Sequence, residues 1–240
     1  MKDFTVSVRK LTDEGLMREA CESTFIGTSH VSLETIYKSE HSPVRTQLFW
    51  ITLKNIPLFI STHLIRHHVG SVPFQLTCRD DRKGGNPGLI AKIADIRTRL
   101  SNLIDDWSKG GSFIGPHAEE AESISEELNW LADNSDRYTP VNLSVLVNAQ
   151  SLIDMAKLRL CSGTAHHETV EVFKAIKQKI SEVDPALASM MVRKCVYRNG
   201  LCGEQRCCGF NHSSAFIVEL QDYVSHFTEK QRGNLILPTE

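Results

Sequence analysis

The sequence predicts a single α+β domain in which helices dominate. Several stretches repeat apolar residues at helical spacing, while one stretch alternates as a strand does. The 240 residues suffice for one large domain, or two small ones, with a sizeable core. Hydrophobic residues make up 41% of the chain and charged residues 23%, which is ordinary for a globular protein.

The strand is expected at residues 47–54, with Phe49, Ile51 and Leu53 on one face. Leu48 and Trp50 lie on the other face, which predicts a strand covered on both sides. Asn55 marks a break, and Pro57 suits the first turn of a helix that runs to His68.

Further helices are expected where apolar residues recur every three or four positions. A long one should open at Pro140, with Asn142 as its N-cap, and continue to Leu160. The others are predicted near residues 12–21, 31–39, 88–108, 118–132 and 166–183. Asp184-Pro185 should end the last of these helices.

Charge and hydropathy exclude several classes of protein. A net charge of −2 excludes a strongly basic nucleic-acid binder. No apolar run is long enough to span a bilayer, and the start MKDFTVSVRK lacks the apolar region of a signal peptide. A cytoplasmic protein without a disulfide framework is therefore expected, consistent with an odd count of seven cysteines.

The segment after the Pro57 helix is the richest in chemistry. The helix ends in Arg66-His67-His68, and the following polar loop offers Gln75, Thr77 and Arg79 within five residues. A guanidinium and a hydroxyl together suit a phosphate group. From the residues alone, a solvated surface loop is as good an explanation as a binding site.

The stretch STHLIRHHVGSVPFQLTCR resembles the signature of flavin-dependent thymidylate synthases. That signature reads Arg-His-Arg, a short gap, Ser, and then Glu-x-Ser-x-Arg. Arg66 and His67 match its start, and Gln75, Thr77 and Arg79 match its end if the gap holds one extra residue. Upstream, His41-Ser42-Pro43 followed by a strand and a helix also follows the family's order.

A second stretch resembles the same family independently. Residues 147–152, VNAQSL, followed by Leu158-Arg159, match the family's Val-Asn-Ala-Arg-Ser-Leu and Leu-Arg pattern at the same spacing. Arg137 stands where the family often has a phosphate-binding arginine. The resemblance covers about residues 20–183 and implies a catalytic domain over 1–210, with a central mixed or antiparallel sheet and a tail of unknown role at 211–240.

The resemblance implies an enzyme that methylates dUMP to dTMP. In the family, FAD binds at a subunit interface of a homotetramer, NADPH reduces it, and methylenetetrahydrofolate supplies the carbon. Carried over, Arg159 is the catalytic residue, which polarises the pyrimidine. The expected substrate-binding residues are His63, Thr77, Arg79, Arg137 and Arg159, and the expected flavin-binding residues are Thr24, Arg66, His67, His68, Gln75, Asn148 and Gln150.

Departures from the family pattern leave the substrate open. His68 replaces a permanent cation, so flavin binding is expected to depend on pH near neutrality. Gln75 replaces a carboxylate, and Gln150 replaces an arginine that faces the flavin in the family. A related enzyme that acts on dCMP, or that makes a hydroxymethyl group, remains the alternative.

Two rival hypotheses come from other residues. His63 and His67 lie four apart on a predicted helix, a spacing that suits a metallohydrolase, and His68, His166 and His167 could add ligands. No acidic partner in an HExxH-like pattern accompanies them. A non-catalytic nucleotide-binding protein stapled by zinc is the second rival, and its ligands would be Cys195, Cys202, Cys207 and Cys208.

Overall fold

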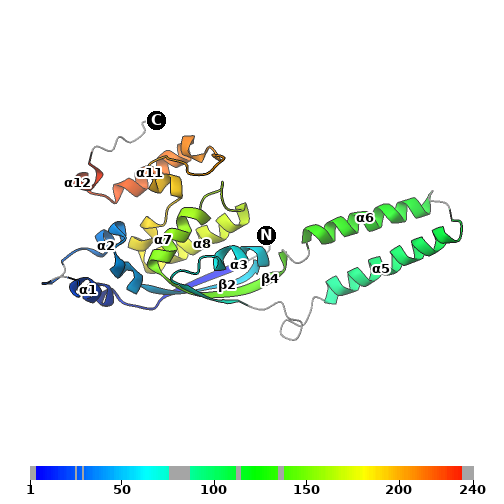
Figure 1. The fold of residues 1–240 in the computed structure, drawn as a ribbon, viewed down its shortest axis with the longest axis horizontal. Coiled ribbons are helices and arrows are strands. Elements are labelled where there is room, and N and C mark those ends of the chain that lie inside the picture. The colour runs from blue at the N-terminus through cyan, green and yellow to red at the C-terminus, as the bar shows by residue number, and fades with distance from the viewer. Residues whose placement is uncertain are drawn as a thin grey trace. The chain divides into compact units, whose positions relative to one another are not determined.

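The computed structural model describes residues 4–24, 26–28, 30–75, 87–111, 115–134 and 138–233. The chain divides into two compact units (Figure 1). One unit joins Met1–Ile56, Ile60–Gln75 and Asn142–Glu240, and the other contains Pro57–Phe59 and Leu76–Val141. None of the described helices combines the length and apolar character that crossing a membrane requires.

The first unit is built on a four-stranded sheet with the order β1-β2-β4-β3. Strand β1 pairs antiparallel with β2, and β3 pairs antiparallel with β4. The strands are β1 (Thr5–Lys10), β2 (Leu48–Pro57), β3 (Ser71–Gln75) and β4 (Pro140–Asn148). The helix-rich α+β fold with a central antiparallel sheet is thereby confirmed.

One face of this sheet forms the core, whereas the other is only partly covered. Phe49, Ile51 and Leu53 are buried as the alternation predicts, but Leu48 and Trp50 are only half-buried. The expectation that both faces of β2 are covered is therefore wrong, because the helices gather on one side. Figure 1 shows α7 (Ala149–Arg159) and α8 (His167–Val183) along that side.

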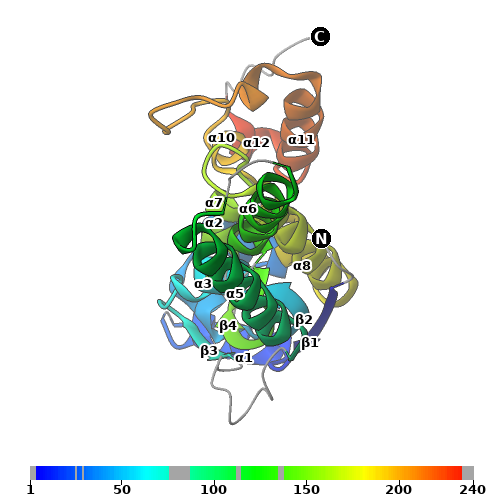
Figure 2. The ribbon, with the colours of Figure 1, turned by 90° about the vertical axis from the view of Figure 1, so that its right-hand side faces the viewer.

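The remaining elements of this unit pack around the same core or come after it in the chain. They are α1 (Glu14–Glu22), α2 (Leu33–Ser39), a 3₁₀ turn (Ser42–Thr46), α3 (Leu58–Ile65, shared with the second unit), α9 (Pro185–Met190), α10 (Lys194–Tyr197), a 3₁₀ turn (Phe210–His212), α11 (Ser214–Ser225) and α12 (Glu229–Arg232). Figure 2 shows α10, α11 and α12 gathered together. Helices α10 and α11 share a small core of their own: Val192, Cys195, Val196, Phe216, Leu220 and Val224.

A buried carboxylate ties three distant parts of this unit together. Asp184 is 5% exposed and accepts from Tyr37 Oη and Lys10 Nζ, each at 2.7 Å. Its other oxygen caps α9 by accepting from the Leu187 N–H at 3.0 Å. Burial and the Asp184 charge raise the pKa of Tyr37, so this hydroxyl stays a hydrogen-bond donor.

The second unit is a pair of helices, α5 (Pro87–Ser108) and α6 (Pro116–Asn134). They contact each other through Ile96 and Leu103 on α5 and Ile124 and Leu131 on α6, which are all buried. Gly110 and Gly115, between the two helices, both have positive φ.

The largest error of the sequence prediction falls at residues 140–148. The expected helix start is strand β4, and the helix begins only at Ala149, with Asn148 rather than Asn142 as its N-cap. Short apolar runs suit either structure, and here pairing with β3 decides. The break expected at Asn55 is a left-handed residue (φ 61°) within β2.

Candidate functional site

The two stretches that resemble the family meet along α7. The end of α3 and the chain that follows it, from His63 to Gly70, contact this helix at both of its ends. At the first end, the Asn148 N–H donates to the Gly70 carbonyl at 2.9 Å, and Ser151 Oγ bonds to the Val69 carbonyl. At the other end lies Arg159, the last residue of α7.

Arg159 is the centre of the contact. Its Nε donates to His67 Nε2 at 2.9 Å and its Nη2 donates to the His63 carbonyl at 2.9 Å. His67 must be neutral to accept this bond, with its proton on Nδ1. Burial, followed by the Arg159 charge, lowers the pKa of His67 to about 4, which agrees with that state.

Among the residues that the structure describes, the half-buried Arg159 has no ion-pair partner. Burial and the nearby Arg66 both lower its pKa. None of the ion pairs among the described residues includes Arg159 or Arg66. The guanidinium keeps N–H donors beyond the two bonds, so the arrangement can polarise a carbonyl or hold an anion.

Asn148 has a structural task as well as its predicted flavin contact. Its Oδ1 caps α7 by accepting from the Ser151 N–H at 2.9 Å. Gly70 (φ 71°) packs directly on it: a Cβ at this position would lie 2.3 Å from Asn148 Nδ2 and 2.5 Å from Ser151 Oγ. The close approach leaves room for glycine alone.

Gln150 lies on a different side of α7. Nine positions separate it from Arg159, about 2.5 helical turns, so the two side chains point in opposite directions. Gln150 Nε2 donates to Glu40 Oε2 at 2.7 Å, and Lys157 pairs with the same carboxylate at 3.0 Å. Within this chain, the structure therefore does not join Gln150 to Arg159.

The other predicted site residues are spread more widely. Thr77, Arg79 and Arg137 lie outside the described residues. Gln75 is half-buried at the end of β3, and the exposed His68 contacts the Arg66 carbonyl through Nδ1 at 3.1 Å. Exposed Thr24 donates to the Cys21 carbonyl at 2.7 Å, in the turn after α1.

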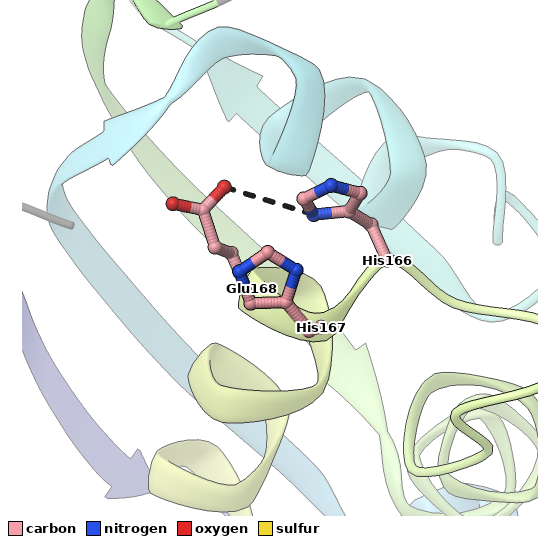
Figure 3. A group of neighbouring side chains, drawn as sticks. All are labelled: His166, His167 and Glu168. Atoms are coloured by element: carbon pink, nitrogen blue, oxygen red, sulfur yellow. Dashed lines mark ion pairs between the residues drawn. The ribbon is translucent and has the colours of Figure 1, made fainter.

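A group that could bind a metal lies at the start of α8 (Figure 3). His166, His167 and Glu168 each offer one ligand atom, and these atoms lie within 4.8 Å of one another. Among the described residues this is the only group to meet that criterion, and it includes neither His63 nor His67. Glu168 Oε2 lies 3.6 Å from His166 Nδ1, which is longer than a hydrogen bond, and this buried oxygen has no hydrogen-bond partner among the described residues.

Two residues of the site were not predicted from the sequence. Thr169 is fully buried and its Oγ1 lies 3.2 Å from His63 Nδ1, which orients the imidazole. Gly70 is the second. The glycine directly after a His-His pair and a valine could have indicated a close backbone approach, whereas nothing in the sequence connects Thr169 with His63.

Comparison with known proteins does not establish the family of this chain. No protein-family profile and no curated protein matches the chain. Among solved structures, it is similar to the UMP/dUMP methylase PolB from Streptomyces cacaoi bound with 5-Br dUMP. The TM-score is 0.47 at 12% identity, over 79% of this chain and 95% of that one. A likeness of this strength assigns neither a family nor an activity to the chain.

Proposed function

We propose that this chain is a flavin-dependent thymidylate synthase-like enzyme that converts dUMP to dTMP with FAD, methylenetetrahydrofolate and NADPH. The observation that carries the proposal is the contact of Arg159 with His67 and His63. It joins two motifs, 92 residues apart, that resemble the same family separately. A surface arginine on an ordinary amphipathic helix would have no reason to meet that other motif.

Arg159 is proposed to donate to a carbonyl of the pyrimidine. Its bonds to His67 and to the His63 backbone fix the guanidinium before substrate binds, which reduces the ordering cost at the moment of reaction. Because no carboxylate neutralises it in the described structure, its charge is available to the developing negative charge on the base. His63, held by Thr169, is proposed to lie beside the nucleotide.

The chain's own donors fit a flavin on the same side of α7. Arg66 and His68 are exposed and suit the phosphates of FAD, and Asn148 packs against Gly70 on the same stretch of chain. Bound FAD would supply the hydride that completes the methyl group. Thr77, Arg79 and Arg137 are proposed to hold the nucleotide phosphate, while Gln75, Gln150 and Thr24 remain proposed flavin contacts in a homotetramer.

The first test is the visible spectrum of the purified protein. We expect bound flavin, a spectral change on addition of dUMP, and dTMP formation when methylenetetrahydrofolate and NADPH are also present. Protein that neither retains nor takes up FAD, and makes no product from any pyrimidine nucleotide, would contradict the proposal.

The same assay separates the alternatives. A spectral change and product with dCMP instead of dUMP would assign the alternative base, and the product mass distinguishes a methyl from a hydroxymethyl group. Flavin or nucleotide binding without turnover would indicate the non-catalytic protein. Hydrolysis that requires a stoichiometric metal, in the absence of flavin, would indicate the metallohydrolase.

A further inference from the structure

Five cysteines from three separate parts of the chain line one pocket. Cys161 follows α7, Cys195 lies on α10, and Cys202, Cys207 and Cys208 lie on the loop after α10. The pocket encloses about 290 Å³, part of which is open solvent. Cys161 and Cys195 are buried at its base, whereas the three loop cysteines are exposed. The proposed catalytic function uses none of these thiols.

The geometry around Gly163 brings the far ends of this set together. A Cβ on Gly163 would lie 3.6 Å from Cys208 Sγ and 3.8 Å from Cys161 Sγ, so both thiols border the same small residue. Ser162 Oγ also lies 3.8 Å from Cys208 Sγ. The loop thus returns to the end of α7, although 46 positions separate it from Ser162.

Arg193 also contacts both the end of α7 and the chain after the cysteine loop. Its Nη1 donates to the Leu160 carbonyl at 2.8 Å, and its guanidinium lies 4.0 Å from the Phe210 ring centroid. Leu160 directly precedes Cys161, and Phe210 follows the Cys207-Cys208 pair by two positions. Burial, followed by the neighbouring Cys161, raises the pKa of Cys195 to about 11, and the nearby Arg193 charge offsets only a small part of that shift.

Backbone N–H groups are directed at two of the three loop cysteines. The Gly209 N–H points at Cys207 Sγ at 3.4 Å, in a turn where Gly209 has φ 79°. The Phe210 N–H is directed at Cys208 Sγ in the same way. N–H donors directed at sulfur stabilise its negative charge, as they do around metal-bound thiolates.

We propose that Cys161, Cys195, Cys202 and Cys208 bind one structural Zn²⁺ ion. Four thiolates satisfy a closed tetrahedral zinc site, and each thiol gives up its proton to solvent on binding. Cys207 is left out because its thiol donates to Asn211 Oδ1 at 3.0 Å. No three Sγ atoms of the described cysteines lie within 4.8 Å of one another, so zinc draws the loop inward onto the two buried thiols.

The C-terminal core is small, so a bound metal ion would add to its stability. This core has only six buried residues, within the stretch from Val192 to Val224. A segment of about 40 residues rarely holds together by apolar burial alone, and a metal is a common remedy. Zinc bound between Cys161 and the loop would fasten this segment to the end of α7.

The test is the zinc content of the purified full chain, measured by inductively coupled plasma mass spectrometry. We expect about one zinc per chain for the natural sequence, in accord with one four-ligand site. C202S and C208S should lose it, and C207S, the matched control, should keep it. C202S and C208S change exposed side chains, and circular dichroism checks that they fold.

Replacement of zinc by Co²⁺ gives a readout that is independent of enzyme activity. A tetrahedral thiolate site produces intense visible bands, which C208S should lack and C207S should retain. A chain without zinc that does not take up Co²⁺, or equal zinc in all variants, would overturn the proposal. Iron with acid-labile sulfide in place of zinc would overturn the choice of metal. Neither the zinc content nor the Co²⁺ spectrum depends on the binding of flavin or nucleotide.

Discussion

The two units each contain a prominent arginine, and the two arginines differ in what surrounds them. Arg99 on α5 contacts three carboxylates, with Nε 2.5 Å from Glu120 and Nη1 2.7 Å from Glu127 and 3.5 Å from Asp95. Arg159 on α7 contacts an imidazole and a backbone carbonyl. The pKa of Arg99 is raised, chiefly by its bonds to Glu120 and Glu127, whereas burial lowers that of Arg159.

The difference supports the proposed role of Arg159 in the reaction and a structural role for Arg99. A cation among carboxylates is already neutralised and joins the two helices of its unit. A half-buried cation held by neutral acceptors keeps its charge, and the fold tolerates this at a cost in stability. Such groups concentrate where a protein binds an anion or a polarised carbonyl, so the comparison points to Arg159 rather than Arg99 as the reactive centre.

The largest effect is expected from Arg159→Ala. Removing the donor proposed to stabilise charge on the base should lower kcat about 10²–10³-fold, the cost of losing one preorganised donor. Flavin absorbance of the purified protein should change little, because Arg66, His68 and Asn148 remain. Steady-state turnover with dUMP, methylenetetrahydrofolate and NADPH measures this, and unaltered kcat would remove Arg159 from the mechanism.

Gly70→Ala should have the second largest effect, on stability. The new methyl would require a left-handed alanine and would collide with Asn148 and Ser151, so we expect a loss of about 2–4 kcal/mol in the free energy of unfolding. Gly115→Ala is the matched control: its φ is 66°, but a Cβ there meets nothing within 4 Å. Urea unfolding should separate the two variants, and equal losses would contradict the close packing of Gly70 on α7.

How far the sequence predicted the fold depends on the length of each element. The amphipathic helices at 87–108, 116–134 and 167–183 are long enough for their period to be unambiguous, and all three were predicted within a few residues. Strand β3 is five residues long and β4 ends directly in a helix, so their patterns were indistinguishable from a loop and a helix start. Their identity comes from pairing with each other, which is a tertiary property.

The candidate site was predictable only as far as its motifs reach. The paired motifs predicted His63, His67, Asn148 and Arg159 in one site; in the structure His63 and His67 contact Arg159 at one end of α7, while Asn148 caps the other end. They also suggested Gln150, which the helical period turns away toward Glu40. Thr169 could not be predicted, because a buried threonine beside His63 depends on how α3 and α8 pack.

A smaller effect is expected from the titration of His67. Its pKa is about 4 in the folded chain, against about 6.5 for an unperturbed histidine. The unfolded chain therefore binds a proton first as pH falls. Above pH 6.5, His67 is neutral in both states and does not change the free energy of unfolding. Between pH 6.5 and about 4, protonation of His67 in the unfolded chain lowers the free energy of unfolding.

Because the side chain is only half-buried, solvent screening reduces this decline to about 1–2 kcal/mol. Urea unfolding between pH 7 and 4 measures it. His67→Gln keeps an acceptor for Arg159 without titrating, so its stability should fall less over the same range. Parallel pH profiles for the two proteins would show that folding does not lower the pKa of His67.

Arg99→Ala should have the smallest effect on activity and so completes the comparison with Arg159. Its carboxylate partners are at the surface of α5 and α6, where solvent and salt screen ion pairs. We expect unchanged turnover and flavin content, with a slight decrease in helix stability that disappears at high salt. Circular dichroism during thermal unfolding at low and high salt measures the stability, and the steady-state assay measures the turnover. If Arg99→Ala lowered turnover as much as Arg159→Ala does, then neutralisation by carboxylates would not distinguish a structural arginine from a reactive one in this protein.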